Sequence, residues 1–267
     1  MIESLRVAPG SAPGIPGRDT RDDLGLDTKE AASLVLDDLR ERIADLQERL
    51  HAEGTRAVLL VLQGLDASGK DGVIRSVFSG VSPLGVHATS FGVPTEIELA
   101  HDYLWRVEAA LPPRGTIGIF NRSHYEDVVA VRMGALAPEE VWRRRPAHIR
   151  EWERTLVDEG TTVLKVFLNV SKEEQRQRLQ ERVDDPLKRW KFRMGDLEVR
   201  KRFDEYVASW EEVIGETSTD WAPWHVVPAD RNWVKSTAVA TLLVDALEQL
   251  GPRLPEPEAG IEGMVIV

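Results

Sequence analysis

Five short apolar runs, each separated from the next by a segment with helical periodicity, constrain the fold of this chain more than any other feature. The runs cover residues 57–62, 86–91, 116–120, 163–170 and 225–227. Short buried strands that alternate with helices are typical of parallel sheets, because each crossover between parallel strands needs a helix. The pattern therefore predicts an α/β domain with a parallel sheet.

The two ends of the chain differ from the middle in composition. Residues 1–26 are rich in proline and glycine, which predicts a flexible N-terminal arm. Residues 27–250 form a single domain, which opens with a long amphipathic helix capped by Asp27 and Glu30. Residues 251–267, again rich in proline, are expected to form a C-terminal tail. The apolar stripe of the first helix can pack on its own domain or on a second copy, and we favour the former.

Charge and composition exclude several classes of protein. The formal net charge of −11 argues against nucleic acid as a partner of the whole surface. No apolar run approaches the roughly 18 residues that a membrane helix needs, so we expect no membrane partner. The absence of cysteine excludes disulfides and zinc–thiolate sites and fits a reducing compartment. We therefore expect a cytoplasmic protein.

A glycine-rich segment, GLDASGKDG at residues 64–72, lies between the first apolar run and a helical segment. Strand, glycine-rich turn and helix together form the context of a phosphate-binding loop. The glycines allow a tight turn that directs several backbone N–H groups at one anion, and the lysine adds a cation. We expect phosphate to be bound by Gly64, Ala67, Ser68, Gly69, Lys70 and Asp71.

Two carboxylates in this loop are unusual. Asp71 stands where a hydroxyl usually ligates magnesium, and Asp66 lies among the expected phosphate contacts. A carboxylate beside phosphate is repelled unless Mg²⁺ lies between them or the carboxylate accepts a proton. Asp66 is thus the candidate metal ligand, with a loop cap as its alternative. Asp71 is equally well explained as an acidic residue in a first helical turn.

The third apolar run ends in a dense polar segment, NRSHYED at residues 121–127. Ligands of open parallel sheets bind beyond the carboxyl ends of strands, so this segment should face the loop. Arg122 is then a clamp for phosphate, and Glu126 or Asp127 can hold a metal or a hydroxyl. We interpret His124 and Tyr125 as loop packing. Upstream, the i, i+4 spacing of Asp102 and Arg106 favours a salt bridge within one helix.

One segment is basic in an otherwise acidic chain. Residues 182–202 contain eight basic and four acidic side chains. A cationic segment after the fourth run can close over phosphates as a lid, and a solvated helix face is the alternative. The candidate lid residues are Arg182, Lys188, Lys191 and Arg193.

Taken together, residues 28–250 resemble the family-2 polyphosphate kinases. Four motifs carry the resemblance, in this order: GLDASGKDG, SFGVPTEIELAHDYLWR, IFNRSHYEDV and ERVDDPLKRWKFRMGD. The resemblance implies a three-layer, P-loop kinase-like fold with a five-stranded parallel sheet, a helical lid around residues 182–202 and an added N-terminal helix. It also implies phosphoryl transfer between inorganic polyphosphate and a nucleotide with Mg²⁺ or Mn²⁺. The run NRSHYEDV is most similar to the class that acts on both AMP and ADP.

The resemblance also implies roles for single residues. Asp66 is a metal-binding and catalytic carboxylate, Lys70 the loop lysine and Arg182 a lid arginine. Asn121 and Arg122 end a Walker B-like strand, and we add Glu126 to the nucleotide-binding and phosphate-binding set. Our hypothesis is a homo-oligomeric, polyphosphate-dependent kinase of AMP and ADP, with guanine nucleotides as further acceptors. An ATP-dependent nucleotide or small-metabolite kinase and a non-catalytic polyanion-binding module remain alternatives.

Overall fold

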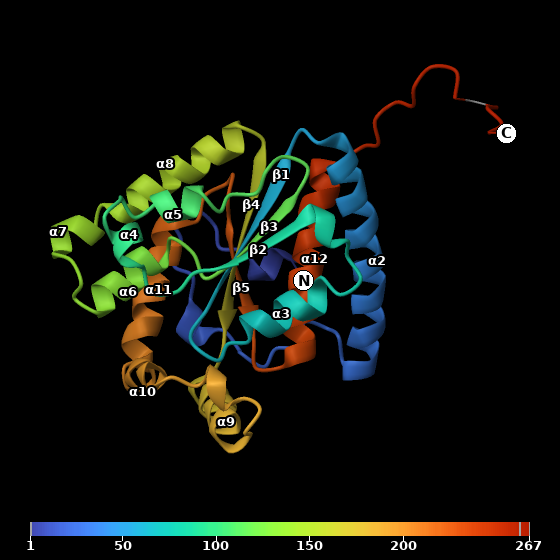
Figure 1. The fold of residues 1–267 in the computed structure, drawn as a ribbon. Coiled ribbons are helices and arrows are strands. Elements are labelled where there is room, and N and C mark those ends of the chain that lie inside the picture. Colours follow the sequence, from blue (N-terminus) through green and yellow to red (C-terminus); the bar gives the residue numbers. More distant parts are fainter. Residues whose placement is uncertain (1, 262, 267) are drawn as a thin grey trace.

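A five-stranded parallel sheet forms the centre of the computed structural model, which describes residues 2–261 and 263–266 (Figure 1). The spatial order is β2-β3-β1-β4-β5, and every neighbouring pair is parallel. Each strand lies within two residues of a predicted run, so the predicted sheet is confirmed. The strands are β1 (Ala57–Gln63), β2 (Val86–Ser90), β3 (Ile117–Asn121), β4 (Thr161–Asn169) and β5 (Trp224–Pro228).

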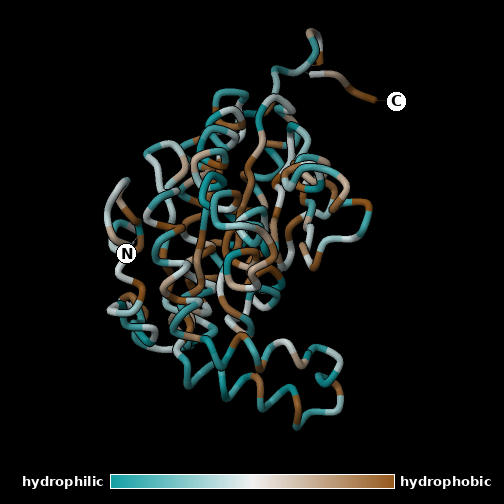
Figure 2. Tube along the Cα trace, turned by 90° about the vertical axis from the view of Figure 1, so that its left-hand side faces the viewer, coloured by the Kyte–Doolittle hydropathy of each residue, from teal (hydrophilic) through white to brown (hydrophobic). Residues whose placement is uncertain are grey.

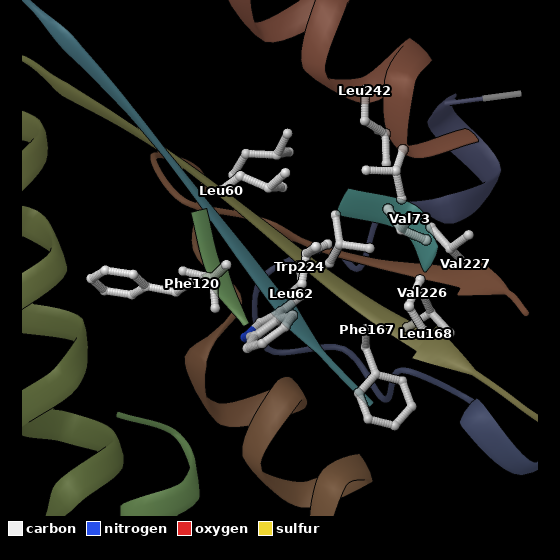
Figure 3. Close-up of a cluster of buried hydrophobic side chains, with 14 of the residues drawn as sticks. Leu60, Leu62, Val73, Phe120, Phe167, Leu168, Trp224, Val226, Val227 and Leu242 are labelled. Carbon is white, nitrogen blue, oxygen red and sulfur yellow. The ribbon is translucent and has the colours of Figure 1, made fainter. Parts of the chain in front are cut away.

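Helices cover both faces of this sheet and give three layers. On one side lie α2 (Lys29–Glu53), α3 (Lys70–Val77) and α12 (Asn232–Leu250), and on the other α6 (Glu126–Met133), α8 (Arg145–Asp158) and α11 (Phe203–Thr217) (Figure 1). All seven residues of β1 are buried, because a central parallel strand is covered on both faces. Figure 3 shows the core between sheet and helices, with side chains from four strands, α3 and α12.

The first long helix packs on its own domain, as we favoured. Leu36, Leu39, Ile43 and Leu50 are buried in the main core, and α2 lies along α12. Its cap is one residue later than predicted: Thr28 accepts the Ala31 N–H at 3.1 Å. Asp27 has a φ of +54° and Thr28 is extended, which is the conformation that an N-cap needs.

Residues 2–26 differ from the flexible arm that composition predicted. They include α1 (Ile2–Leu5) and a 3₁₀ turn, η1 (Ile15–Gly17), and they bury Leu5, Val7 and Ile15. The Val7 N–H donates to the Trp224 carbonyl at 2.8 Å. Both carboxylate oxygens of Glu211 accept N–H groups of the arm, from Gly14 and Ile15, at 2.7 Å. Regular structure over residues 2–26 is limited to two short helical segments, but apolar side chains still anchor the arm to the domain.

The expected lid projects beyond the carboxyl ends of the strands. This lid at residues 182–202 comprises the end of α9 (Lys172–Asp184), η3 (Arg189–Lys191) and α10 (Met194–Lys201), which lie below the sheet in Figure 1. Its trace is mostly hydrophilic (Figure 2). Short segments complete the fold: η2 (Pro83–Gly85), α4 (Glu96–Leu99), α5 (Trp105–Glu108) and α7 (Glu139–Trp142).

After α12 the chain leaves the body of the domain (Figure 1). The predicted tail, as far as it is described, contains no helix or strand over residues 251–261 and 263–266. Glu262 and Val267 lie outside the described residues. Within the described part of the chain, no helix has both the length and the apolarity to cross a bilayer.

Candidate active site

The glycine-rich loop connects β1 to α3, in the predicted context. Gly64 and Gly69 have φ values of +149° and +98°, and Ala67 also has a positive φ, +62°. A Cβ on Gly64 would lie 2.8 Å from the Leu168 carbonyl oxygen, so both backbone conformation and space require glycine there. The loop therefore has the tight, irregular backbone of an anion-binding turn.

Lys70 folds back over this loop. Its Nζ donates to the Gly64 carbonyl at 2.7 Å and to the Leu65 carbonyl at 3.3 Å, and the residue is buried. Burial, with a contribution from the nearby Arg122, lowers the pKa of Lys70 to about 8. A bound anion would restore the full charge of this amine, so Lys70 is suited to phosphate.

Arg122 lies beside the loop because β3 pairs with β1, which places Asn121 opposite Leu62. Its guanidinium forms an ion pair with Asp66 and lies 3.7 Å from Glu126 Oε2. Burial lowers the pKa of Arg122, but these two carboxylates outweigh burial and leave it raised. Burial also raises the pKa of Glu126, although Arg122 and Lys70 oppose the change. The expected phosphate clamp is therefore paired with the expected metal ligand.

Asp71 connects the loop to β3 and to the lid. Its Oδ1 accepts the Asn121 amide N–H at 2.8 Å, and its Oδ2 lies 3.7 Å from Lys191 Nζ. Burial raises the pKa of Asp71, but the Asn121 hydrogen bond and Lys191 outweigh burial and leave the pKa lowered. Asp71 is thus ionised and held in one orientation. An ionised carboxylate is required both of a residue at the phosphate site and of an acidic residue in a first helical turn.

The lid brings only some of its predicted cations to the loop. Arg182 lies 3.5 Å from Asp196 of α10, and Lys191 reaches Asp71. Burial, and then the charge of Asp66, raise the pKa of Asp196. Lys188 instead pairs with Asp185 of the lid itself at 3.1 Å. Arg193 is exposed at the start of α10.

The predicted Asp102–Arg106 salt bridge is wrong. Arg106 donates to Asp127 Oδ2 at 3.1 Å and to the Gly92 carbonyl at 3.0 Å. Asp102 accepts the Leu104 N–H instead, at 2.9 Å, because it starts a turn and does not lie inside a helix. With Asp127 held by Arg106, Glu126 is the acidic residue of this segment that faces the loop.

His124 and Tyr125 point into the interior, so their interpretation as packing residues is confirmed. Both are fully buried, and the Tyr125 hydroxyl donates to Glu153 Oε1 at 2.8 Å. Lys165 Nζ lies 2.5 Å from the other oxygen of Glu153. This buried ion pair packs against Tyr125 and so supports the turn that bears Arg122 and Glu126.

Four residues beside the loop were missed by sequence reasoning, which counted Asp196 only as a charge. Lys235 offered a signal: it is a charged residue at a buried position of α12, where most buried positions are apolar. Gln175 and Arg178 have no local pattern that marks them, because their loop partners lie 109 to 111 residues away in sequence. The four residues are Gln175, Arg178, Asp196 and Lys235.

The described residues contain no cluster of three or more His, Asp or Glu side chains that could hold a metal. Mg²⁺ in kinase sites is held by one or two carboxylates, with substrate phosphates and water as the other ligands. Asp66 supplies one carboxylate at the loop, so the side chains present fit a metal that arrives with phosphate. A dedicated protein cage is not required.

A phosphate-binding loop, an arginine at the neighbouring strand end and a basic helical lid define the class of P-loop kinases. The family model described as Polyphosphate kinase 2 (PPK2) matches residues 26–254. The chain belongs to this family, and the resemblance inferred from its motifs is confirmed.

Relatives and solved structures agree with this assignment. The chain is 58% identical over 238 residues to the AMP/ADP-polyphosphate phosphotransferase of Meiothermus ruber, covering 89% of each chain. It is 40% identical over 266 residues to the ADP-polyphosphate phosphotransferase of Rhodopseudomonas palustris, covering 95% of this chain and 92% of the relative. The crystal structure of polyphosphate kinase 2 from Arthrobacter aurescens superposes with a TM-score of 0.93 at 40% identity, covering 97% and 93% of the two chains.

Proposed function

We propose that this enzyme transfers a terminal phosphoryl group between inorganic polyphosphate and the terminal phosphate of AMP or ADP. The name of the Meiothermus ruber relative, at 58% identity, supports both acceptors. Phosphoanhydride bonds are broken and formed on both sides, so the reaction runs in either direction.

One observation carries the proposal of catalysis over mere binding: the carboxylate of Asp66 lies in the loop, paired with Arg122. A protein that only binds polyanions gains nothing from a carboxylate among its phosphate contacts, because like charges repel. A kinase gains a metal ligand. Asp66 with its partner Arg122 therefore favours phosphoryl transfer.

The proposed roles follow from charge and position. The acceptor is already an oxyanion, so the site needs no strong base, and catalysis depends on orientation and charge neutralisation. Lys70 and Arg122 would contact the transferring group, and Arg182 would approach it from the lid. Arg122 must then exchange Asp66 for phosphate. Asp66 would hold Mg²⁺ or Mn²⁺, which neutralises charge on the phosphates when bound.

The remaining binding roles are assigned to the loop and its neighbours. Backbone N–H groups from Gly64 to Lys70 would bind phosphate, with Asp71, Asn121 and Glu126 bordering the same space. Lys191 is the lid lysine nearest the loop, 3.7 Å from Asp71. We therefore propose that polyphosphate passes between the loop and Lys191.

The test is a donor and acceptor screen on the purified chain. Polyphosphate alone or ATP alone is offered with AMP, ADP or GDP, with and without Mg²⁺ or Mn²⁺, and nucleotide products are separated chromatographically. We expect ADP and ATP from AMP with polyphosphate as donor. Transfer from ATP only would favour the small-metabolite or nucleotide kinase. Polyphosphate binding without any transfer would favour the non-catalytic module.

We further propose a cytoplasmic location and a homo-oligomeric state. The absence of cysteine from the sequence fits a reducing compartment. Cell fractionation tests the first proposal. Light scattering in solution tests the second, for which a monomeric mass would be the contrary result.

A further inference from the structure

Three consecutive carbonyl groups of the phosphate-binding loop are hydrogen-bonded from behind by side chains of α9 and α12. Gln175 Nε2 donates to the Asp66 carbonyl at 3.1 Å. Arg178 Nη1 donates to the carbonyls of Ala67 and Ser68 at 3.1 and 3.0 Å. Lys235 Nζ donates to the same Ser68 carbonyl at 3.1 Å. The function proposed above assigns no role to these side chains.

Arg178 uses every donor it has within the protein. Besides its two loop bonds, Nη2 donates to the carbonyls of Ala229 and Asp230 at 2.8 Å each. Nε donates to Glu174 Oε1 at 2.8 Å. A guanidinium has five N–H groups in a rigid plane, so none is left for a substrate. Arg178 therefore acts on the loop and not on the phosphates.

Lys235 completes the same arrangement from α12. It is 1% exposed, and its Nζ also donates to Asn232 Oδ1 at 2.6 Å. A Cβ on Gly69 would lie 2.2 Å from this Nζ, so the amine occupies the space that glycine leaves open. Burial, and then the nearby Arg178, lower the pKa of Lys235 to about 7. A buried amine whose hydrogen bonds go to Ser68 and Asn232, beside the guanidinium of Arg178, implies a specific structural role.

The geometry of the peptide bond says what that role is. In a trans peptide the N–H points opposite to the carbonyl of the same unit. Carbonyls of Asp66 and Ser68 drawn toward α9 and α12 therefore turn the N–H groups of Ala67 and Gly69 to the opposite side of the loop.

We propose that Arg178 and Lys235 are positioning residues that hold the loop in its anion-binding conformation. Arg178 also lies one helical turn before Arg182 on α9, so the same helix fixes the loop and carries the lid arginine. The inference rests on the proposed function only in taking this loop as the phosphate site.

The experiment compares four variants with the wild-type enzyme. Arg178→Lys removes the five-donor fork while keeping the charge, and Lys235→Met removes the amine while keeping length. Arg176→Lys and Lys172→Met are matched controls on α9, where both side chains are exposed and pair with other surface groups. Tripolyphosphate binding is measured by calorimetry without nucleotide, and KM and kcat are measured with polyphosphate and AMP.

We expect tripolyphosphate to bind Arg178→Lys and Lys235→Met about tenfold more weakly or worse, because a charge-assisted hydrogen bond contributes at least that much. KM for polyphosphate should rise by a similar factor while KM for AMP changes little. Both controls should match the wild type.

Wild-type affinity in both variants would overturn the inference, and so would a lower kcat with an unchanged KM for polyphosphate. Arg178→Lys can fail to fold, but Lys235→Met replaces a buried charge by an apolar side chain, which proteins often tolerate. Lys235→Met therefore decides the test alone if needed. Failure of the wild-type chain to bind tripolyphosphate would instead refute the proposed function, and the inference with it.

Discussion

Glu153→Gln should strongly lower the free energy of unfolding, although Glu153 makes no hydrogen bond or ion pair with the phosphate-binding loop at residues 64–72. Glu153 and Lys165 are fully buried, and the carboxylate lies 2.5 Å from the lysine Nζ. Burial raises the pKa of Glu153, but Lys165 and His124 together outweigh burial and leave the pKa lowered, so the carboxylate is ionised in the wild type. The substitution leaves Lys165 with neutral acceptors only: the new amide oxygen, the Tyr125 hydroxyl at 3.1 Å and the Thr217 carbonyl at 2.8 Å.

The magnitude follows from this burial. Removal of one partner of a buried ion pair costs about 3–5 kcal/mol in the free energy of unfolding. For a domain of this size, each kcal/mol lowers Tm by roughly 2–4 °C, so we expect a fall of about 6–20 °C. The exposed Glu151, two residues earlier on α8, is the matched control, and Glu151→Gln should stay within about 0.5 kcal/mol.

Thermal and urea unfolding followed by circular dichroism measure the effect. Lys165→Met in the Glu153→Gln background removes the unpaired charge and should recover more than half of the loss. Burial lowers the pKa of Lys165, so the unfolded variant binds more protons than the folded one and its deficit should shrink as pH rises from 7 to 10. Equal melting temperatures for Glu153→Gln and Glu151→Gln would refute this reasoning.

Three further outcomes are expected. Asp66→Asn should lower kcat by about 100-fold or more with little change in Tm, because it removes one partly exposed charge at the loop; near wild-type turnover at saturating Mg²⁺ would contradict the metal role. Lys191→Met should raise KM for long polyphosphate and reduce the slope of log affinity against log salt by about 0.7, and both effects should be larger than in Lys188→Met, because only Lys191 of the two reaches Asp71. Kinetics at two chain lengths and two salt concentrations measure both effects. Burial lowers the pKa of His225 to about 4, so between pH 6.5 and 4 the unfolded chain is protonated at this residue and the folded chain is not; roughly 3 kcal/mol of the free energy of unfolding is lost as pH falls through this range. Urea unfolding of His225→Asn should therefore depend less on pH than that of the wild type, and an equal pH dependence would be the contrary result.

The strands and the loop could be predicted because their signals are local. A central parallel strand such as β1 is apolar along its whole length, and Gly64 and Gly69 stand where the backbone requires positive φ. The rule that ligand-binding residues gather at the carboxyl ends of parallel strands was enough to predict that the loop lies beside the end of β3. The sequence therefore predicted that Asp66, Lys70 and Arg122 gather at this edge of the sheet, and the structure places them close together.

What was missed or mistaken depends on contacts between distant segments. The arm is held by Glu211, nearly 200 residues away from Gly14, and no local pattern reports that contact. Arg106 has a candidate partner four residues away in Asp102 but pairs with Asp127, because residues around Asp102 form a turn. Spacing rules for helices apply only where a helix forms, and tertiary contacts decide that.

The pairing of charges at the site explains how a chain with a net charge of −11 can bind a polyanion. Three cations near the loop already have a carboxylate partner: Arg122 has Asp66, Arg182 has Asp196, and Lys191 has Asp71. At these three cations, phosphates would therefore replace carboxylates. Such an exchange keeps the cations ordered before substrate arrives, which lowers the entropy lost on binding. It also explains why a charge count along the sequence located the lid but did not separate Lys191, which faces the loop, from Lys188, which does not.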